Sequence, residues 1–310
     1  MSATRFLVSR AAQYLAMWFV AISIDFLATR LAPIIPVRSA GPPRPLYEQY
    51  LYFLWGLLHL NLGVSLWLYG TPVLDLVLKA LQYDVILLVP AILISWHLGN
   101  KLGAYLAMFK AGSRTEMAVV PILYALSSVP YFWLAMLFVE VFSSELRLFP
   151  SSGVIYSALP SFTKYYILDF LRHLALPLMT LVTAMTGTWA LSMRENIIAE
   201  LRSGYVTYEE SLGLSKSILW RHIYDNSKQP QLVNLALSLG LIASGNLVLE
   251  AVVGYPGVGV LLYNAITNYD YMLLEGIYFF IISFILIFNF MVDVILVVID
   301  PRIRYSAGLG

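Results

Sequence analysis

The sequence contains no cysteine, which excludes disulfides, thiolate metal sites and a cysteine nucleophile together. Charged residues are also scarce: 12% of the chain is charged, about half the share of a soluble domain. The net charge is +1 and basic residues form no cluster, so nucleic acid is not an expected partner. Apolar residues make up 60% of the chain and the mean hydropathy is +0.77, which indicates a membrane protein.

Catalytic signatures are missing as well. The sequence has no G-x-x-x-x-G-K-[ST] phosphate loop, no H-E-x-x-H and no G-x-S-x-G. The histidines are scattered without metal-ligand spacing and are expected at interfaces or in helix packing; they are His59, His97, His173 and His222. We therefore expect no catalytic residue, no metal site and no cofactor bound by this chain, and a membrane enzyme is poorly supported.

Long apolar runs predict helices that cross a bilayer, because about 20 such residues span its hydrocarbon core. The first run is too long for a cleaved signal peptide and is predicted to be a retained span within residues 1–35. Residues 36–83 are predicted to form an extracytoplasmic loop with interfacial helices. The predicted spans are 12–35, 84–109, 117–142, 173–194, 230–253 and 273–299.

The distribution of lysine and arginine predicts the orientation of these spans. With the N-terminus inside, eleven Lys and Arg fall in inner segments and six in outer ones. Both termini are therefore expected in the cytoplasm, including a tail at 301–310. Residues 84–300 form the predicted five-helix core, and 195–229 is its only large cytoplasmic connection.

This cytoplasmic loop is predicted to form two short helices joined at a glycine. Residues 207–212 favour a helix, Gly213 can adopt the left-handed conformation that ends it, and Ser215 can cap the next helix. Together the helices predict a compact knob, residues 207–223. An alternative is a loop that only lies on the lipid surface. Four apolar residues are predicted mostly on one face of the second helix: Leu214, Ile218, Leu219 and Ile223.

The stretch "YVTYEESLGLSKSILWRHIYDN" (205–226) resembles the cytoplasmic coupling loop of ABC importer permeases, specifically the dipeptide/oligopeptide family. Further strings resemble that family in order and spacing: "NLGVSL" (61–66), "SVPYFWLAML" (128–137), "LRLFPSSG" (146–153), "HLALP" (173–177), "LEAVVGYPGVG" (249–259), the Asp270–Tyr271 pair and "NFMVDVILVVIDPRIRY" (289–305). The resemblance implies an all-α integral membrane protein with six transmembrane helices, the type I ABC importer permease fold and a cytoplasmic coupling helix.

In the resembling family this loop docks into a cleft on an ATP-hydrolysing subunit. The implied coupling residues here are Thr207, Tyr208, Glu209, Glu210, Ser211, Leu212, Gly213, Leu214 and Ser215. Relatives often carry alanine and basic residues before the glycine, where this chain has Glu209 and Glu210. We therefore hypothesise that the ATPase presents Lys or Arg near both glutamates. A second departure is "GNKLG" (99–103), where relatives tend to have an apolar-proline pair.

The resemblance also implies a complex. Its expected members are a homologous second permease, two ATPase subunits that carry ATP and Mg, an extracytoplasmic binding protein and the surrounding lipid. The implied mechanism is import of di- or oligopeptides by alternating access. Oligosaccharides or nickel are alternative cargoes. A stand-alone secondary carrier is a rival, although it predicts inverted repeats and midplane carboxylates that the sequence does not offer convincingly.

Polar residues inside predicted spans are the remaining candidates, because such residues are costly in lipid. Asn246 and Glu250 are four apart and are expected on one helix face. With the turn at Pro256, Gly257 and Gly259 they are candidates for an outer gate, although Glu250 could equally pair with a neighbouring helix or with amides of the turn.

Three further features complete the set. Pro130 is predicted to let the third span bend and is a further pathway candidate. Asn289 and Asp293 are expected to bond across helices. Asp25 lies deep in the first span without an obvious partner, and Lys101 is near enough to the inner end to extend toward water.

Overall fold

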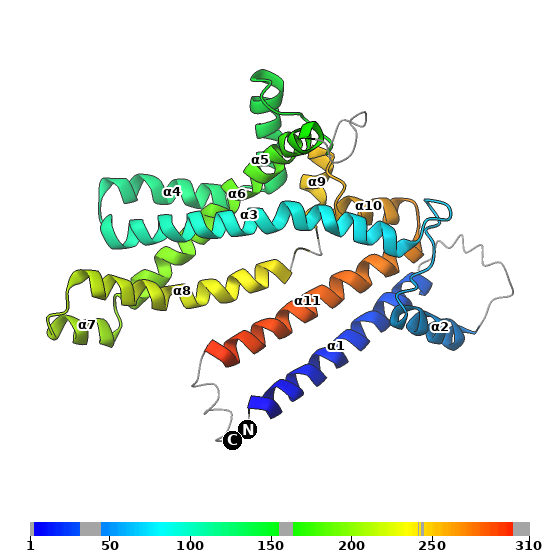
Figure 1. Cartoon of the computed structure of the whole chain (residues 1–310), viewed down its shortest axis with the longest axis horizontal. Helices are drawn as coiled ribbons and strands as arrows, with labels where there is room; N and C mark the ends of the chain where they lie inside the picture. The colour runs from blue at the N-terminus through cyan, green and yellow to red at the C-terminus, as the bar shows by residue number, and fades with distance from the viewer. Residues whose placement is uncertain (1–2, 32–44, 155–163, 241, 243–244, 300–310) are drawn as a thin grey trace. The chain divides into compact units, whose positions relative to one another are not determined.

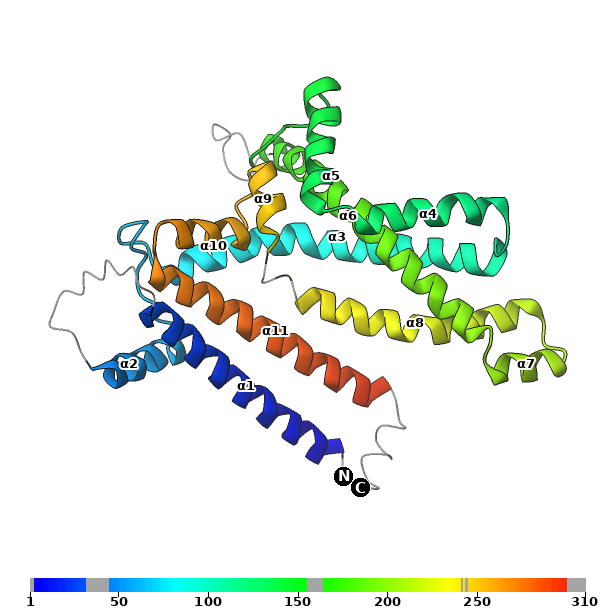
Figure 2. The ribbon, with the colours of Figure 1, turned by 180° about the vertical axis from the view of Figure 1, so that it is seen from behind.

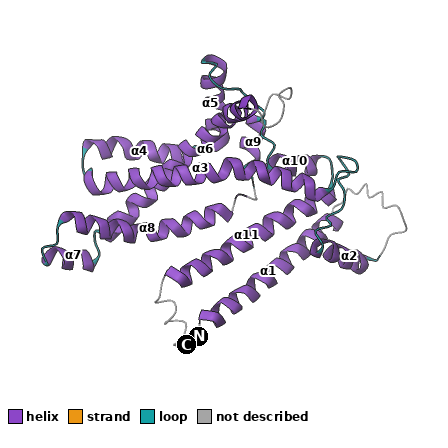
Figure 3. Ribbon diagram, viewed as in Figure 1, coloured by secondary structure: helices purple, strands orange, loops and turns teal. Residues whose placement is uncertain are grey.

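The computed structural model describes residues 3–31, 45–154, 164–240, 242 and 245–299, and every regular element within them is a helix (Figures 1 and 3). Figure 3 shows only helices and loops in this part of the chain. The elements are α1 (Ala3–Leu31), α2 (Leu46–Leu58), α3 (Val73–Phe109), α4 (Arg114–Ser128), α5 (Tyr131–Phe138), the π-helical segment η1 (Val139–Glu145), α6 (Lys164–Glu200), α7 (Gly204–Ser211), α8 (Lys216–Gly240), α9 (Leu247–Val253), α10 (Val258–Thr267) and α11 (Tyr271–Ile299).

Four of these helices are long and apolar enough to cross a membrane: α1, α3, α6 and α11. Two bent pairs, α4 with the α5–η1 segment and α9 with α10, bring the number of candidate spans to as many as six. The predicted all-helical membrane fold is confirmed. Two of the predicted spans, however, are not single straight helices.

The third span is broken at Pro130. The helices on either side of this residue meet at 103°, so residues 117–142 do not form the straight span that hydropathy predicts. Val129 ends α4 with an extended backbone (ψ 128°), the conformation that a following proline favours. Pro130 then caps α5 at φ −59°. The predicted bend at Pro130 is thus confirmed, and it is sharper than a kink.

The fifth predicted span, residues 230–253, is wrong as a continuous helix. Helix α8 passes through Pro230 and ends at Gly240, and α9 begins only at Leu247. Gly245 (φ +64°) and Gly254 (φ +63°) adopt left-handed conformations on either side of α9, which glycine adopts at no steric cost. Helix α10 follows α9 at an angle of 94°.

The second span begins earlier than predicted. Helix α3 starts at Val73, so residues 73–83 are continuous with the helix that contains the predicted span. The rest of the predicted loop does contain a short helix, α2, followed by a tight turn closed by a bridge between Val64 and Pro72. Both α3 and α6 have 37 residues, which corresponds to a rise of about 55 Å.

The chain divides into two compact units, and their boundary falls within α3. The first unit contains residues 1–85, 240–251 and 256–310. Within it, α1 and α11 lie side by side along their length (Figures 1 and 2). Its core joins Ile22 of α1, Val73 and Val77 of α3, and Leu273 and Ile277 of α11.

The second unit contains residues 86–239 and 252–255. Its helices α3 and α6 touch backbone to backbone, because Gly99 and Gly103 lie one turn apart on the same face of α3. A Cβ on Gly99 would lie 2.9 Å from the carbonyl oxygen of Thr186, and one on Gly103 would lie 2.1 Å from that of Ala190. The "GNKLG" departure therefore supplies a close helix contact.

Candidate functional site

The knob contains a helix that ends at its glycine, as the sequence predicts. Gly213 has φ +72°, and its amide donates to the Glu210 carbonyl at 3.0 Å. The Leu214 amide donates to the Glu209 carbonyl at 3.3 Å. This pair of bonds is the Schellman arrangement that closes a helix on a left-handed residue. Helix α7 itself begins at Gly204, ahead of the predicted start at 207.

An apolar cluster anchors the knob to the rest of the second unit. Val206 of α7 and Leu219 and Ile223 of α8 are buried. They pack with residues of α3 and α6, namely Ala104, Ala107, Met193 and Ile197. Because the cluster joins four helices, α7 is held to the ends of α3 and α6 by buried apolar contact and not by its glycine alone.

A tyrosine adds a polar attachment beside this cluster. The Tyr205 hydroxyl donates to Oε2 of Glu200 at 2.8 Å, which ties α7 back to the end of α6. Burial raises the pKa of Tyr205 above its usual value, and the Glu200 carboxylate raises it further. The phenol therefore stays protonated at neutral pH and remains a donor.

The outward face of the knob is largely apolar at its centre. Tyr208 is 64% exposed and Leu212 is 59% exposed, and Thr207, Glu210 and Ser211 are exposed around them. The predicted apolar face of the second helix divides: Leu219 and Ile223 point inward, whereas Leu214 and Ile218 are exposed and extend the outward face. Contiguous exposed apolar side chains are typical of an interaction surface.

The two acidic residues of the knob are not equivalent. Glu209 is bonded within the chain, since Nδ1 of His222 lies 2.9 Å from Oε1 and 3.1 Å from Oε2 of its carboxylate. Glu210 is exposed. The Ser215 hydroxyl lies 3.1 Å from the Ser217 hydroxyl. The Ser215 carbonyl accepts the first amide hydrogen bonds of α8. Glu209 is thus bonded to His222, whereas Glu210 is exposed and not bonded to it.

Glu250 binds the amides of a turn, residues 245–260, which we call the Glu250 turn. Its side chain is 1% exposed. It accepts hydrogen bonds from the amides of Asn246 and Val260, the latter at 2.9 Å. Asn246 lies just before α9 begins, so the two residues are joined through this amide and do not share a face within one helix. The expected pairing of Glu250 with amides of the turn is observed, and the role of this residue in an outer gate stays a prediction.

A second buried carboxylate, which sequence reasoning missed, meets the same turn. Asp84 of α3 is 1% exposed and accepts from the Val258 amide at 3.0 Å, at the start of α10. A Cβ on Gly257 would lie 2.2 Å from Asp84 Oδ1 and 2.6 Å from Glu250 Oε2. The two carboxyl groups therefore lie within about 5 Å of each other, and only glycine fits between them.

Gly259 is similarly enclosed. A Cβ there would lie 2.5 Å from the backbone of Leu247 and 3.0 Å from Glu250 Oε1. Pro256 directly precedes Gly257, the N-cap residue of α10. Three of the predicted gate residues, Asn246, Gly257 and Gly259, thus lie against the Glu250 carboxylate, whereas Pro130 lies in the other unit.

Helices α4 and α6 are joined by an ion pair that the sequence did not reveal. Arg194 donates to Glu116 Oε1 through Nε at 2.8 Å and Nη2 at 2.6 Å. Glu116 also accepts from the Gly112 amide at 2.6 Å, while its own amide donates to the Ser113 hydroxyl at 3.2 Å. Ser113 and Glu116 thus cap α4 in the S-x-x-E pattern, with the arginine bound to the cap.

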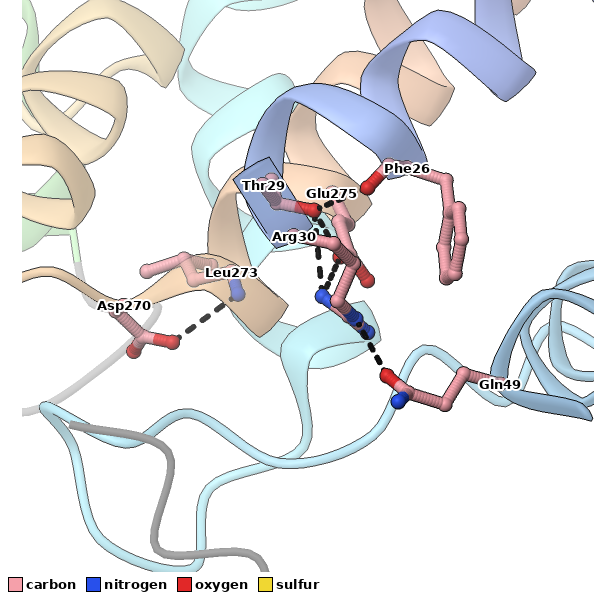
Figure 4. Close-up of polar contacts among 7 residues, drawn as sticks. All are labelled: Phe26, Thr29, Arg30, Gln49, Asp270, Leu273 and Glu275. Atoms are coloured by element: carbon pink, nitrogen blue, oxygen red, sulfur yellow. Dashed lines mark hydrogen bonds and ion pairs between the residues drawn. The ribbon is translucent and has the colours of Figure 1, made fainter. Parts of the chain in front are cut away.

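Figure 4 shows a polar cluster in the first unit, where α1 and α11 meet. Glu275 of α11 accepts at 2.6 Å from both Thr29 and Arg30 of α1. Arg30 also donates to Gln49 of α2 at 3.1 Å. Asp25, one turn deeper in α1, is 7% exposed, and its Oδ2 has no hydrogen-bond partner among the described residues.

Asp270 caps the start of α11. It accepts from the Leu273 amide at 3.1 Å (Figure 4) and from the Trp67 amide at 3.0 Å. The Ser65 hydroxyl donates to the same carboxylate. Asp270 of the Asp270–Tyr271 pair therefore joins the segment before α3 to α11.

The remaining predictions concern helix ends. Asp293 of α11 accepts from the Tyr14 hydroxyl at 3.0 Å and lies 3.5 Å from Arg10 Nε, so its predicted bond across helices is confirmed. Asn289 is half-buried and Lys101 is exposed. Among the described residues, no group of three or more His, Asp or Glu side chains is arranged to hold a metal ion.

Comparison with known proteins gives a consistent result. Residues 99–305 match the family described as the binding-protein-dependent transport system inner membrane component. A putative peptide permease protein of Brucella ovis is 31% identical over 86% of this chain and 82% of its own length. The di/tripeptide transport system permease protein DppB of Pseudomonas aeruginosa is 28% identical over 87% of this chain and 84% of its own, and the dipeptide transport system permease protein DppB of Escherichia coli is 25% identical over the same shares.

Proposed function

Because the chain belongs to the binding-protein-dependent transport system inner membrane component family of ABC importer permeases, we propose that it forms half of the pathway through which an ATP-driven importer carries di- and oligopeptides. The names of its relatives support the peptide cargo, since they include peptide, dipeptide and di/tripeptide permeases. Members of this family are transport subunits and not themselves catalytic.

The single observation that carries the proposal is the knob. Its outward face exposes Tyr208 and Leu212, which a protein without a partner at this surface has no reason to hold in water. Its inward face is fixed by the buried Val206, Leu219 and Ile223. Because the outer face of the knob is apolar and its inner face is packed against α3, α6 and α8, a displacement of the knob is transmitted to these helices.

The partner at the knob is proposed to be an ATPase subunit on the cytoplasmic side. The full complex then holds this chain, a homologous permease, two ATPases and an extracytoplasmic binding protein, with both termini of this chain in the cytoplasm. ATP and Mg bind the partner ATPases. A basic group on the ATPase pairs with Glu210, because Glu209 is already bonded to His222.

The mechanism follows from linkage between nucleotide and conformation. Nucleotide shifts the permease toward an outward-open state only through contacts that differ between the two states, some of them at the knob. Closure of the ATPase dimer displaces α7, and the buried cluster carries this displacement into α3, α6 and α8. Hydrolysis reverses the shift and returns the pathway to its inward-facing state.

At the opposite side, we assign the Glu250 turn to the outer mouth. Glu250 and Asp84 hold the start of α10 from two directions, so the turn moves as one body with both carboxylates. Gly257 and Gly259 leave room for those carboxylates, and Asn246 supplies an amide. The turn is thereby stiff enough to present a fixed surface to a binding protein.

The test is purification of the tagged chain from its native membrane, with its partners and bound cargo identified by mass spectrometry. We expect two ATPases, a second permease and a binding protein that carries peptides. A chain that purifies without an ATPase would overturn the proposal. Glycans in place of peptides would refute the cargo and leave the mechanism standing.

The Tyr208→Ala variant tests the surface itself. It is expected to lose the ATPase from the purified complex, whereas Tyr69→Ala, at a 90% exposed tyrosine outside the knob, keeps it. In the same assay Glu210→Lys is expected to weaken the complex more than Glu140→Lys, which changes an exposed glutamate of η1. Equal retention of the ATPase by Tyr208→Ala and Tyr69→Ala would show that the partner binds elsewhere.

A further inference from the structure

Four buried polar atoms in the second unit have no protein hydrogen-bond partner within the described chain. They are Oδ1 and Nδ2 of Asn100, Oγ of Ser227 and Oε1 of Gln231. Asn100 is 2% exposed, Ser227 is 1% exposed and Gln231 is fully buried. An unsatisfied polar group is expensive inside a protein and more so inside a membrane protein, so a cluster of them needs a partner.

The register of the helices brings these residues together. Trp96 Nε1 of α3 donates to the Gln231 carbonyl of α8 at 3.2 Å. Two turns further along α3, Ala104 shares an apolar cluster with Ile223, which lies two turns earlier in α8. The two helices are therefore antiparallel. Asn100, halfway between Trp96 and Ala104, lies at the level of Ser227.

Helix α6 contacts α8 both at Gln231 and at Ser227. Gln231 Nε2 donates to the Ser192 hydroxyl at 2.8 Å, and Asn196 Nδ2 donates to the Ser227 carbonyl at 3.4 Å. Ser192 and Asn196 are four apart and so lie on one face of α6. Polar side chains of three helices thus converge on one buried layer, directly beyond the apolar cluster that anchors the knob.

We propose that Asn100, Ser227 and Gln231 form a buried water-binding site between α3, α6 and α8, completed by Ser192 and Asn196. Water is the ligand whose chemistry fits, because the unpartnered atoms include both donors and acceptors. Buried waters typically make two to four hydrogen bonds to such groups.

Other ligands fit the site poorly. A bare cation would leave the amide donors of Asn100 without an acceptor and would repel them. The Lys228 ammonium, 5.7 Å from the centre of the Trp96 ring, adds a positive charge beside the layer. Each of the four unpartnered atoms is closed off from bulk solvent, so a peptide-sized solute cannot reach them.

The site has a consequence for α8. Hydrogen bonds through water exchange partners readily, so α8 can shift against α3 and α6 without losing direct bonds between side chains. Helix α8 begins within the knob, so a displacement of the knob that is transmitted along α8 must pass this layer. This consequence rests on the proposed function, whereas the site itself does not.

The test compares two buried serines in the intact complex purified from its native membrane. Ser95 is fully buried and donates to its own helix at the Ile92 carbonyl, so Ser95→Ala removes a hydroxyl that needs no water. Ser227→Ala is expected to lower the unfolding midpoint by about 2–4 °C more than Ser95→Ala, because the water loses a partner. A rise in the midpoint for Ser227→Ala would overturn the proposal, since removal of an unsatisfied hydroxyl from a dry site relieves a cost.

A high-resolution map of the complex gives the second readout. We expect density for water at about 2.7–3.2 Å from the Asn100 amide and the Ser227 hydroxyl. Two results would overturn the proposal: no such density between the side chains of this layer, or an Asn100 amide that is bonded directly to another protein group. Neither readout involves cargo or ATP, so failure of the water site is distinguishable from failure of the transport function.

Discussion

Replacement of Gly103 by alanine is expected to force α3 away from α6. The added Cβ would lie 2.1 Å from the Ala190 carbonyl oxygen and 3.0 Å from its carbonyl carbon. Both atoms belong to the backbone of α6 and cannot rotate away. Ordinary contact between carbon atoms begins near about 3.5 Å, so the helices must separate by roughly 1 Å at this point.

The cost follows from that separation. A gap of about 0.5–1 Å forfeits a quarter to a half of the dispersion energy of the atoms facing it, and overpacking a close contact costs about 1–3 kcal/mol. We expect the unfolding free energy of Gly103→Ala to fall by this amount. The measurement is thermal unfolding of the purified protein in detergent, with a midpoint lowered by about 2–4 °C per kcal/mol.

The control is Gly204→Ala. A Cβ on Gly204 meets nothing within 4 Å and its backbone is not left-handed, so this change is expected to stay within about 0.5 kcal/mol of the parent. If Gly103→Ala unfolds at the same temperature as Gly204→Ala and the parent, then α3 and α6 do not meet backbone to backbone at this point, and the reasoning is refuted.

Three other substitutions act on single interactions. Glu250→Gln is expected to cost about 1–3 kcal/mol, because its amide nitrogen cannot accept the bonds that the carboxylate receives from the turn; thermal unfolding measures this. Arg194→Ala is expected to cost about 1.5–3 kcal/mol, because it removes both charged bonds to the buried Glu116, and the same assay applies. Gly213→Ala is expected to cost about 1 kcal/mol at φ +72°, seen as faster hydrogen exchange in α7.

Each of these has a matched control. Glu140→Gln and Arg202→Ala change exposed side chains and are expected to leave stability unaltered. Gly204→Ala, at the other end of α7, is the control for Gly213→Ala. Stability of Glu250→Gln equal to that of Glu140→Gln would contradict the amide-binding role, and unaltered exchange in Gly213→Ala would contradict the left-handed helix end.

Local signals in the sequence predicted local structure well. Gly213 was predicted to end a helix because a glycine after a helix-forming stretch is the usual left-handed terminator. Long apolar runs located α1, α6 and α11 for a similar reason, since each run needs only its own residues to satisfy its backbone. The bend at Pro130 also follows from one residue and its neighbour.

The failures have a different physical origin. Hydropathy stays high through residues 230–253, so it cannot reveal that α8 ends at Gly240 and that α9 begins at Leu247. That break depends on Gly245 and on amide bonds to Glu250, which is a matter of backbone geometry and not of apolar content. Composition alone carries no information about it.

Partners distant in the chain were equally out of reach. Asp84 binds the Val258 amide across 174 positions, and Arg194 binds Glu116 across 78. Periodicity reports which residues share a face of one helix, whereas these bonds depend on how different helices pack. Asp84 did have one visible signal, a carboxylate at the edge of a long apolar run.

The 37-residue lengths of α3 and α6 make bilayer thickness a variable for this protein. Each helix rises about 55 Å, whereas the hydrocarbon layer is about 30 Å thick. The ends of both helices carry charged residues, such as Asp75 and Lys79 of α3 and Lys164 and Glu200 of α6, and can extend beyond that layer. A change in lipid thickness is met by a change of tilt, at a cost of fractions of a kcal/mol per Å. Because Gly99 and Gly103 lock α3 against α6, the pair must tilt together when the lipid becomes thinner or thicker. Membrane composition therefore acts on the same helices to which the proposed function assigns the displacement of the knob.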